Sequence, residues 1–149
     1  MMGRIRLTRR FVFDMAHALL SYDGPCKNIH GHTYSFSLTL LGDPLQAPGH
    51  PKDGMVYDFS LLKGIVERKV LQQFDHALVL SANENEDLVR NIADRYEKVV
   101  LLKLQPTCEH LLLHFIELVK NELPENLKLD AARLDETPNS YAEWRIEDQ

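Results

Sequence analysis

Hydrophobic and polar residues alternate along several short segments of the chain. Residues 5–13 place apolar side chains at most odd positions and arginine or threonine at most even ones. A period of two is typical of a strand with one buried face. Residues 33–41 repeat the alternation, which predicts a second strand there. Two late strands are expected at residues 127–134 and 141–146.

Two longer segments follow the helical period instead. The first has a capping residue at Asp58 or Ser60 and places apolar side chains three and four positions apart as far as Phe74. This spacing predicts an amphipathic helix. The second helix is expected to begin at Thr107 and to stop at Pro124, because proline cannot continue a helix.

The segment between these helices is less regular. Residues 84–96 are polar and predict a short helix, whereas residues 99–104 fit either a short strand or an apolar connector. No internal repeat, low-complexity tract or linker divides the sequence, so residues 1–149 are expected to form a single domain. The order of strands, then helices, then strands favours an α+β fold with an antiparallel sheet and helices packed on one face.

Charge and composition narrow the possible partners. The 149 residues carry a formal net charge of −5, which argues against a nucleic-acid-binding protein because such proteins carry a basic excess. No apolar run approaches the roughly 20 residues needed to span a bilayer, and no signal-peptide core follows the basic N-terminus. The expected location is the cytoplasm, without a membrane partner. Cys26 and Cys108 are too few for a disulfide-stapled secreted domain and are expected to be free thiols.

Three histidines near the first two predicted strands form the clearest chemical pattern. His30 and His32 are two residues apart in an extended segment, so their side chains point to the same side. His17 lies at the end of the preceding strand, and a loop return would bring it alongside. Three neutral imidazoles with an open fourth position match a catalytic zinc site. The alternative is a set of ordinary surface or hydrogen-bonded histidines.

Cys26 lies between these histidines in the sequence. It could be a fourth zinc ligand, although its spacing to His30 and His32 is not a common zinc-finger spacing. It could also lie beside the metal as a base or nucleophile, because a nearby cation favours the thiolate. A third alternative is an inert buried thiol.

Four further residues carry acid or base groups with weaker signals. Asp75 and His76 form a carboxylate–imidazole pair of the kind that supports a proton relay, but such a pair at a helix end is more often a cap. Glu109 lies in the first turn of the second helix, where the helix dipole favours an anion in any case. Glu136 could accept two parallel N–H bonds from an amino-pyrimidine edge, but its local sequence alone indicates a surface turn residue.

Taken together, these segments resemble the 6-pyruvoyl-tetrahydropterin synthase / 6-carboxytetrahydropterin synthase family. The motifs that carry the resemblance occur in the family's order, from near the N-terminus almost to the end of the chain. They are Phe13-Asp14-Met15-Ala16-His17, the segment from Cys26 to His32, the segment from Gly54 to Lys63, Phe74-Asp75-His76, Pro106-Thr107-Cys108-Glu109 and Glu136-Thr137-Pro138.

The resemblance implies a T-fold, in which a four-stranded antiparallel sheet carries two helices on one face and assembles into an oligomeric barrel. It also implies a homo-oligomer, typically a hexamer of two trimers, with active sites between subunits. Carried over to this chain, the family's residues are His17, His30 and His32 for zinc, Cys26 for the thiolate that moves a proton, Asp75 and His76 for the relay, Glu136 for anchoring the pterin ring, and Thr107 and Glu109 for further pterin contacts.

The gap between Cys26 and His30 and the sequence of residues 136–144 look like the carboxy branch of the family, which serves the queuosine (7-deazaguanine) pathway. The resemblance therefore predicts a zinc-dependent lyase that converts 7,8-dihydroneopterin triphosphate to 6-carboxy-5,6,7,8-tetrahydropterin, releasing acetaldehyde and triphosphate. One alternative is a 6-pyruvoyl-tetrahydropterin synthase that eliminates triphosphate from the same substrate. Others are a non-catalytic pterin- or purine-binding oligomer and a zinc hydrolase. Cys108 and His110 stand where the family often has other residue types, and the stretch 81–105 is longer than is common.

Overall fold

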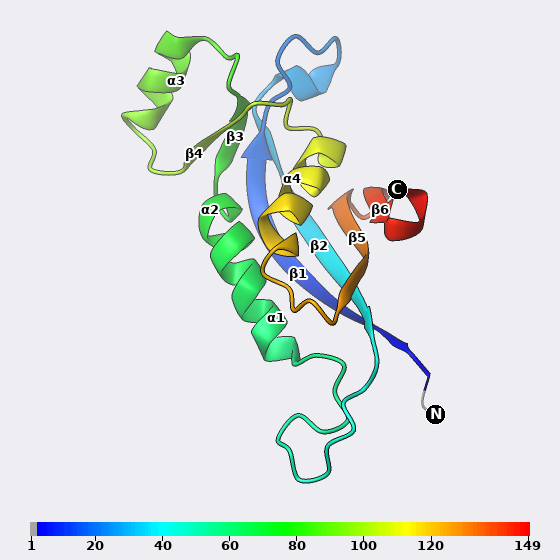
Figure 1. The fold of residues 1–149 in the computed structure, drawn as a ribbon. Helices are drawn as coiled ribbons and strands as arrows, with labels where there is room; N and C mark the ends of the chain where they lie inside the picture. The colour runs from blue at the N-terminus through cyan, green and yellow to red at the C-terminus, as the bar shows by residue number, and fades with distance from the viewer. Residues whose placement is uncertain (1–2) are drawn as a thin grey trace.

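One six-stranded sheet organises the protein, with its strands in the order β4-β3-β1-β2-β5-β6 (Figure 1). A computed structural model describes residues 3–149. The strands are β1 (Ile5–His17), β2 (His30–Gly42), β3 (Leu78–Ser81), β4 (Val99–Leu102), β5 (Lys128–Thr137) and β6 (Ser140–Arg145). The helices are α1 (Phe59–Val66), α2 (Gln72–Phe74), α3 (Glu86–Ala93) and α4 (Cys108–Lys120). Two 3-10 turns, η1 (Pro25–Lys27) and η3 (Ile146–Asp148), and one π-helical segment, η2 (Glu67–Leu71), complete the helical structure.

The antiparallel pair of β1 and β2 forms the centre of the sheet. The two strands pair along their whole length, from Ile5 opposite Gly42 to His17 opposite His30. β5 pairs antiparallel with β2, and β6 pairs antiparallel with β5. These four strands confirm the antiparallel sheet predicted from the alternating segments, and each of the first two extends several residues further toward the loop between them than predicted.

Two helical segments cover one face of this sheet and enclose the core. α1 continues through the wider turn η2 into α2, and this helix lies beside α4 against β1 and β2 (Figure 1). Phe115 of α4 is fully buried. Its ring centre lies 6.0 Å from that of Phe13 and 5.4 Å from that of Phe36. It also lies 4.9 Å from the ring centre of Phe74. Phe115 thus contacts both helical segments and both central strands. Truncating a buried phenylalanine to alanine typically lowers the folding stability by about 3–5 kcal/mol.

Capping side chains set where both core helices begin. Asp58 accepts a hydrogen bond from the backbone N–H of Ser60 and precedes α1, so Asp58 is the cap of the two candidates. Thr107 accepts a hydrogen bond from the backbone N–H of His110 and precedes α4, which begins one residue after the predicted start and ends at Lys120, before Pro124. Each cap satisfies an amide of the first turn that has no partner within the helix.

The prediction of four strands, all antiparallel, was wrong in two respects. β3 and β4 add two strands beyond β1, and both new pairings, β1 with β3 and β3 with β4, are parallel. β3 was missed because a strand buried on both faces forms a short continuous apolar run without alternation. Of the two alternatives for residues 99–104, the strand is correct over Val99–Leu102.

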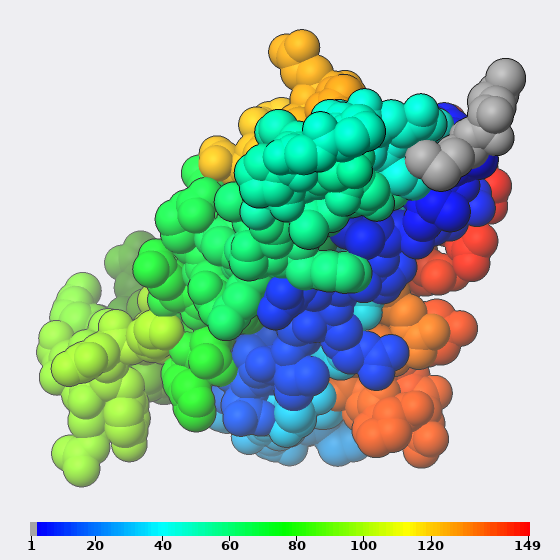
Figure 2. Space-filling model, turned by 90° about the horizontal axis from the view of Figure 1, so that it is seen from below, coloured from blue at the N-terminus to red at the C-terminus, as the bar shows by residue number. Residues whose placement is uncertain are grey.

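The predicted short helix at residues 84–96 is present as α3, which is a third helix outside the two-helix layer. None of its eight residues is buried, and the segment around it projects from the body of the protein (Figures 1 and 2). Within residues 3–149, no helix combines the length and the apolar character needed to cross a membrane.

Candidate metal centre and adjoining pocket

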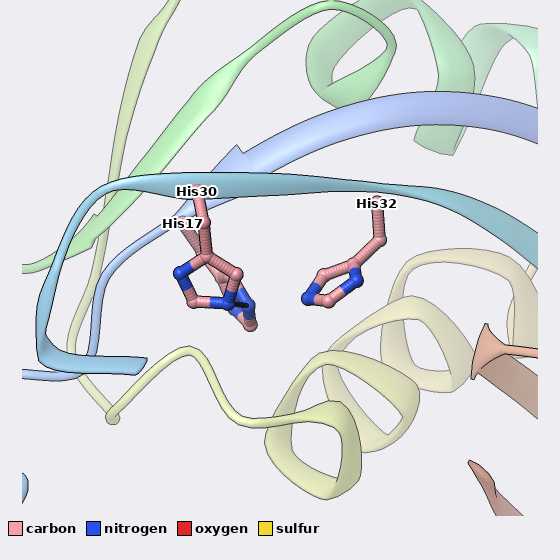
Figure 3. A group of neighbouring side chains, drawn as sticks. All are labelled: His17, His30 and His32. Atoms are coloured by element: carbon pink, nitrogen blue, oxygen red, sulfur yellow. Dashed lines mark hydrogen bonds between the residues drawn. The ribbon is translucent and has the colours of Figure 1, made fainter. Parts of the chain in front are cut away.

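The three predicted zinc ligands lie together at one end of the central strand pair. His17 ends β1 opposite His30, which begins β2, and His32 is paired with Met15. Each of the three histidines offers a ligand atom, and these atoms all lie within 4.8 Å of one another. Figure 3 shows the three rings extending from the two strands into the same space. The alternation of the strands and their register therefore bring the three side chains to one point.

Backbone carbonyl groups fix the orientation of two of these rings. His17 Nδ1 lies 2.8 Å from the carbonyl oxygen of Pro106, and His30 Nδ1 lies 2.7 Å from that of Asn28. A carbonyl oxygen only accepts, so Nδ1 carries the hydrogen and Nε2 of the neutral ring presents a lone pair. The Nε2 atoms of His17 and His30 are 3.1 Å apart. Two lone pairs at this distance repel one another unless a cation lies between them.

His32 supplies the third nitrogen. Its Nε2 is buried and has no hydrogen-bond partner among the described residues, and an unpaired buried polar atom costs about 1–3 kcal/mol. A divalent cation would satisfy this atom together with the lone pairs of the other two rings. Three imidazoles form the donor set of an open zinc-type site, and carbonyl groups behind the rings are the usual outer support of such a site. The residues present thus fit a bound metal ion.

Burial favours the neutral form of two of the three ligand rings, those of His17 and His32. It lowers the pKa of His17, which is 2% exposed, and also that of His32, because the charged imidazolium loses hydration. The carboxylate of Glu136 acts in the opposite direction, with oxygens 3.9 Å from His17 Nε2 and 3.8 Å from His32 Nε2. Burial is the larger effect on both rings, so both are available as ligands at neutral pH.

A cavity of about 350 Å³ opens beside the histidines. Five of the predicted site residues line it, namely His17, Cys26, Thr107, Glu109 and Glu136. Leu19, Tyr22 and part of β6 also line it. Sequence reasoning missed these residues because no motif marks them. They reach the cavity because the loop after β1 folds over it and because β6 pairs with β5.

Glu136 is placed in the cavity by the strand that carries it. It belongs to β5 and follows the fully buried Leu134 by two residues. The pairing of β5 with β6 is irregular between Asp135 and Thr137, and such irregularities re-aim a side chain. The side chain of Glu136 is only 23% exposed. Its interpretation as a surface turn residue, from local sequence alone, was wrong.

The two cysteines share the cavity but differ in their surroundings. Cys26 lies in η1 and is partly exposed, so it is not a deeply buried thiol. It also lies outside the group of three histidines whose ligand atoms converge. Cys108 is the first residue of α4, and its Sγ donates a hydrogen bond to the carbonyl oxygen of Leu134 at 3.3 Å. Burial raises the pKa of Cys108 to about 11, so Cys108 remains a neutral thiol.

Asp75 and His76 lie outside this cavity. Asp75 caps the C-terminal end of α2, and its Oδ1 accepts a hydrogen bond from the backbone N–H of Asp14. His76 has a φ of 61° and a side chain that is 76% exposed. It lines a second pocket, together with Asp14 and His32. A single chain therefore does not bring the Asp75–His76 pair into the cavity that contains Cys26.

Sequence comparisons identify relatives over nearly the whole chain. The sequence model of the 6-pyruvoyl tetrahydropterin synthase family matches residues 6–147. A Haemophilus influenzae protein named 6-carboxy-5,6,7,8-tetrahydropterin synthase is 34% identical over 142 residues, which cover 94% of this chain and 98% of the relative.

Solved structures share the fold. An uncharacterized protein from Wolinella succinogenes superposes with a TM-score of 0.80 at 19% identity, covering 97% of this chain and 99% of its own. The 6-pyruvoyl tetrahydropterin synthase of Caenorhabditis elegans superposes with a TM-score of 0.68 at 24% identity, covering 97% and 96% of the two chains. At these identities the likeness establishes the architecture of the sheet and its helices.

Proposed function

The chain belongs to the 6-pyruvoyl tetrahydropterin synthase family, and we propose that it is a zinc-dependent 6-carboxytetrahydropterin synthase. The proposed reaction consumes 7,8-dihydroneopterin triphosphate and water and yields 6-carboxy-5,6,7,8-tetrahydropterin, acetaldehyde and triphosphate. One observation carries the proposal: a single cavity beside the converging histidine triad is lined by His17 of that triad, a partly exposed thiol and a half-buried carboxylate. A protein that only binds pterins needs neither the metal-binding triad nor the thiol.

The residues of the cavity divide the work between binding and proton transfer. The carboxylate of Glu136 would accept two N–H bonds from the amino-pyrimidine edge of the pterin, which fixes the orientation of the ring. Zinc bound by the histidine triad would supply a Lewis acid that polarises the hydroxylated side chain of the substrate. Cys26 would move a proton at that side chain as its thiolate, a form that a nearby cation favours. Thr107 and Glu109, at the start of α4, would complete the contacts to the ring.

We prefer 6-carboxytetrahydropterin over 6-pyruvoyl-tetrahydropterin as the product because a relative of this chain is named 6-carboxy-5,6,7,8-tetrahydropterin synthase. The Haemophilus influenzae protein matches 94% of this chain at 34% identity, and the spacing of Cys26 and His30 agrees with that branch. On this basis we assign the reaction to 7-deazaguanine (queuosine) biosynthesis. The runner-up is elimination of triphosphate to give 6-pyruvoyl-tetrahydropterin.

Product analysis separates these possibilities. Purified protein loaded with zinc is incubated with 7,8-dihydroneopterin triphosphate, and the products are identified by mass spectrometry together with an assay for acetaldehyde. Acetaldehyde and 6-carboxytetrahydropterin are expected in equal amounts. A pyruvoyl product without acetaldehyde would support the runner-up, and unchanged substrate would contradict lyase activity altogether. A hydrolase that uses metal-bound hydroxide would remain active without Cys26, whereas the proposed lyase would not.

A homo-oligomer, which we propose to be a hexamer, would complete the site. β1 pairs with β3 only at Ala16 and His17, so most of its outer edge has no strand partner among residues 3–149. An open edge of this kind favours pairing with another copy. Such an assembly would allow Asp75 and His76 of one subunit to reach the cavity of the next.

Mixed assemblies test this arrangement. A Cys26→Ala variant and a His76→Ala variant are each expected to be nearly inactive, but subunits refolded together should regain activity at cavities that receive one intact residue from each. Light scattering gives the size of the assembly independently. A monomer at micromolar concentration, or mixed assemblies without regained activity, would contradict a shared site.

A further inference from the structure

The side chain of Gln105 holds the loop that follows β1. Its Oε1 accepts a hydrogen bond from the backbone N–H of Leu20 at 3.0 Å, and its Nε2 donates to the carbonyl oxygen of the same residue at 2.6 Å. The amide thus pairs with both backbone groups of Leu20, as a neighbouring strand would. Gln105 and Leu20 are both half-buried, so water competes only partly for these bonds.

Leu20 is linked through its neighbour Leu19 to the segment that carries the thiol of Cys26. The backbone N–H of Leu19 donates a hydrogen bond to the carbonyl oxygen of Cys26 at 2.9 Å. Leu19 and Cys26 also line the same cavity. A displacement of Leu20 therefore moves the residue whose amide holds the backbone of Cys26.

The backbone of Gln105 is fixed at the start of α4. Its carbonyl oxygen accepts hydrogen bonds from the N–H of Thr107 at 2.8 Å and from Nδ1 of His110 at 2.9 Å. The next residue, Pro106, provides the carbonyl oxygen that orients His17. Gln105 thus joins three parts of the site: the first turn of α4, the support of a candidate metal ligand and the loop that carries the thiol.

We propose that Gln105 is a positioning residue, which holds Cys26 at a fixed place beside the histidine triad. The proposal rests on the proposed function, since it assigns Gln105 a role toward the catalytic thiol. Only glutamine among the similar residues fits both bonds. Glutamate has the same length but presents a second acceptor to the carbonyl oxygen of Leu20, and asparagine is one methylene shorter.

Three variants test the proposal in the zinc-loaded, full-length protein. Gln105→Ala removes both bonds, and Gln105→Glu keeps only the one to the Leu20 amide. Gln73→Ala is the matched control, because Gln73 is an exposed glutamine of α2 that lies outside the cavity. Each variant is measured for zinc content, melting temperature and steady-state kinetics. Deuterium uptake of residues 18–28 and the rate of Cys26 alkylation by iodoacetamide, resolved by peptide mass spectrometry, report on the loop without any turnover.

In Gln105→Ala, kcat is expected to fall by about tenfold or more with KM nearly unchanged. Deuterium uptake of residues 18–28 and alkylation of Cys26 should both rise severalfold, while zinc content stays at the wild-type level. Gln105→Glu should show a defect at least as large as Gln105→Ala, because it places a second acceptor against the carbonyl oxygen of Leu20, and Gln73→Ala should match wild type.

Two results would overturn the proposal. One is Gln105→Ala with kcat, deuterium uptake and alkylation all within about twofold of wild type. The other is a lower melting temperature with unchanged uptake and alkylation in residues 18–28, which would show a purely structural role. If the wild-type protein does not turn over the pterin triphosphate, the proposed function fails, whereas the exchange and alkylation measurements still decide whether Gln105 positions Cys26.

Discussion

Replacing Glu136 by glutamine tests the assignment of the pterin-binding carboxylate. The change keeps the length and shape of the side chain but exchanges one carboxylate oxygen for an NH₂ group. Glu136 lines the cavity beside the histidines, and its side chain is only 23% exposed. A donor at this position would face the N–H groups of the amino-pyrimidine edge, so the substituted side chain cannot form the two parallel bonds.

The magnitude follows from the charge and the burial of this carboxylate. A hydrogen bond to a charged group contributes about 1.5–3 kcal/mol, and its loss also strands a donor of the ligand. At about 1.4 kcal/mol per factor of ten, kcat/KM should fall by roughly 10- to 100-fold or more. The melting temperature should change far less than the kinetics, because the substitution keeps the volume and shape of the side chain.

The assay compares Glu136→Gln with Glu125→Gln, an exposed carboxylate in the loop between α4 and β5. Kinetics with the pterin triphosphate, zinc content and melting temperature are measured for both variants. The expected result is a kinetic defect in Glu136→Gln alone, with full zinc content. Near-normal kinetics would refute the reasoning, because the pterin would then be held elsewhere. Loss of zinc would show that Glu136, which lies within 4 Å of two histidines, acts on the metal instead.

Three further predictions concern the metal, the thiols and pH. The double variant His30→Ala, His32→Ala should lose bound zinc, and elemental analysis that finds wild-type zinc content would exclude the proposed ligands. Cys26→Ala should keep zinc and fold while turnover falls by orders of magnitude, whereas Cys108→Ser should remain active; equal activity of the two variants would contradict the assignment of the thiol. Burial lowers the pKa of His114 in the folded protein, so the unfolded chain binds more protons and the metal-free protein should lose stability as pH falls below about 6.5. In His114→Gln, the melting temperature between pH 7 and pH 5 should decline less steeply, and an unchanged slope would argue against this contribution.

Local patterns predicted the fold well wherever one face of an element is buried. The alternation of residues 5–13 and the helical spacing after Asp58 each predicted which side chains point to the core. β3 escaped prediction because three apolar residues followed by Ser81 are too few to show an alternation. The parallel order of β3 and β4 depends on contacts between distant segments, which no local pattern encodes.

The part of the candidate site that depends on strand alternation and on the pairing of two consecutive strands could be predicted from the sequence. His30 and His32 share a side because a strand alternates, and His17 meets them because β1 and β2 pair end to end. The surroundings of Glu136 depend on an irregular pairing of β5 with β6, which its local sequence does not reveal. The role of Gln105 likewise required the fold, because the bonds to Leu20 join residues far apart in the sequence.

The register of the central hairpin also links metal binding to the accuracy of folding. Pairing β1 with β2 one residue out of step would turn His30 and His32 to the opposite face of the sheet. A hairpin in the wrong register could then no longer gather the triad, so an ion that binds the triad would stabilise only chains with the correct pairing. The metal would thus select the correct alignment of β1 and β2 during folding, independently of any substrate.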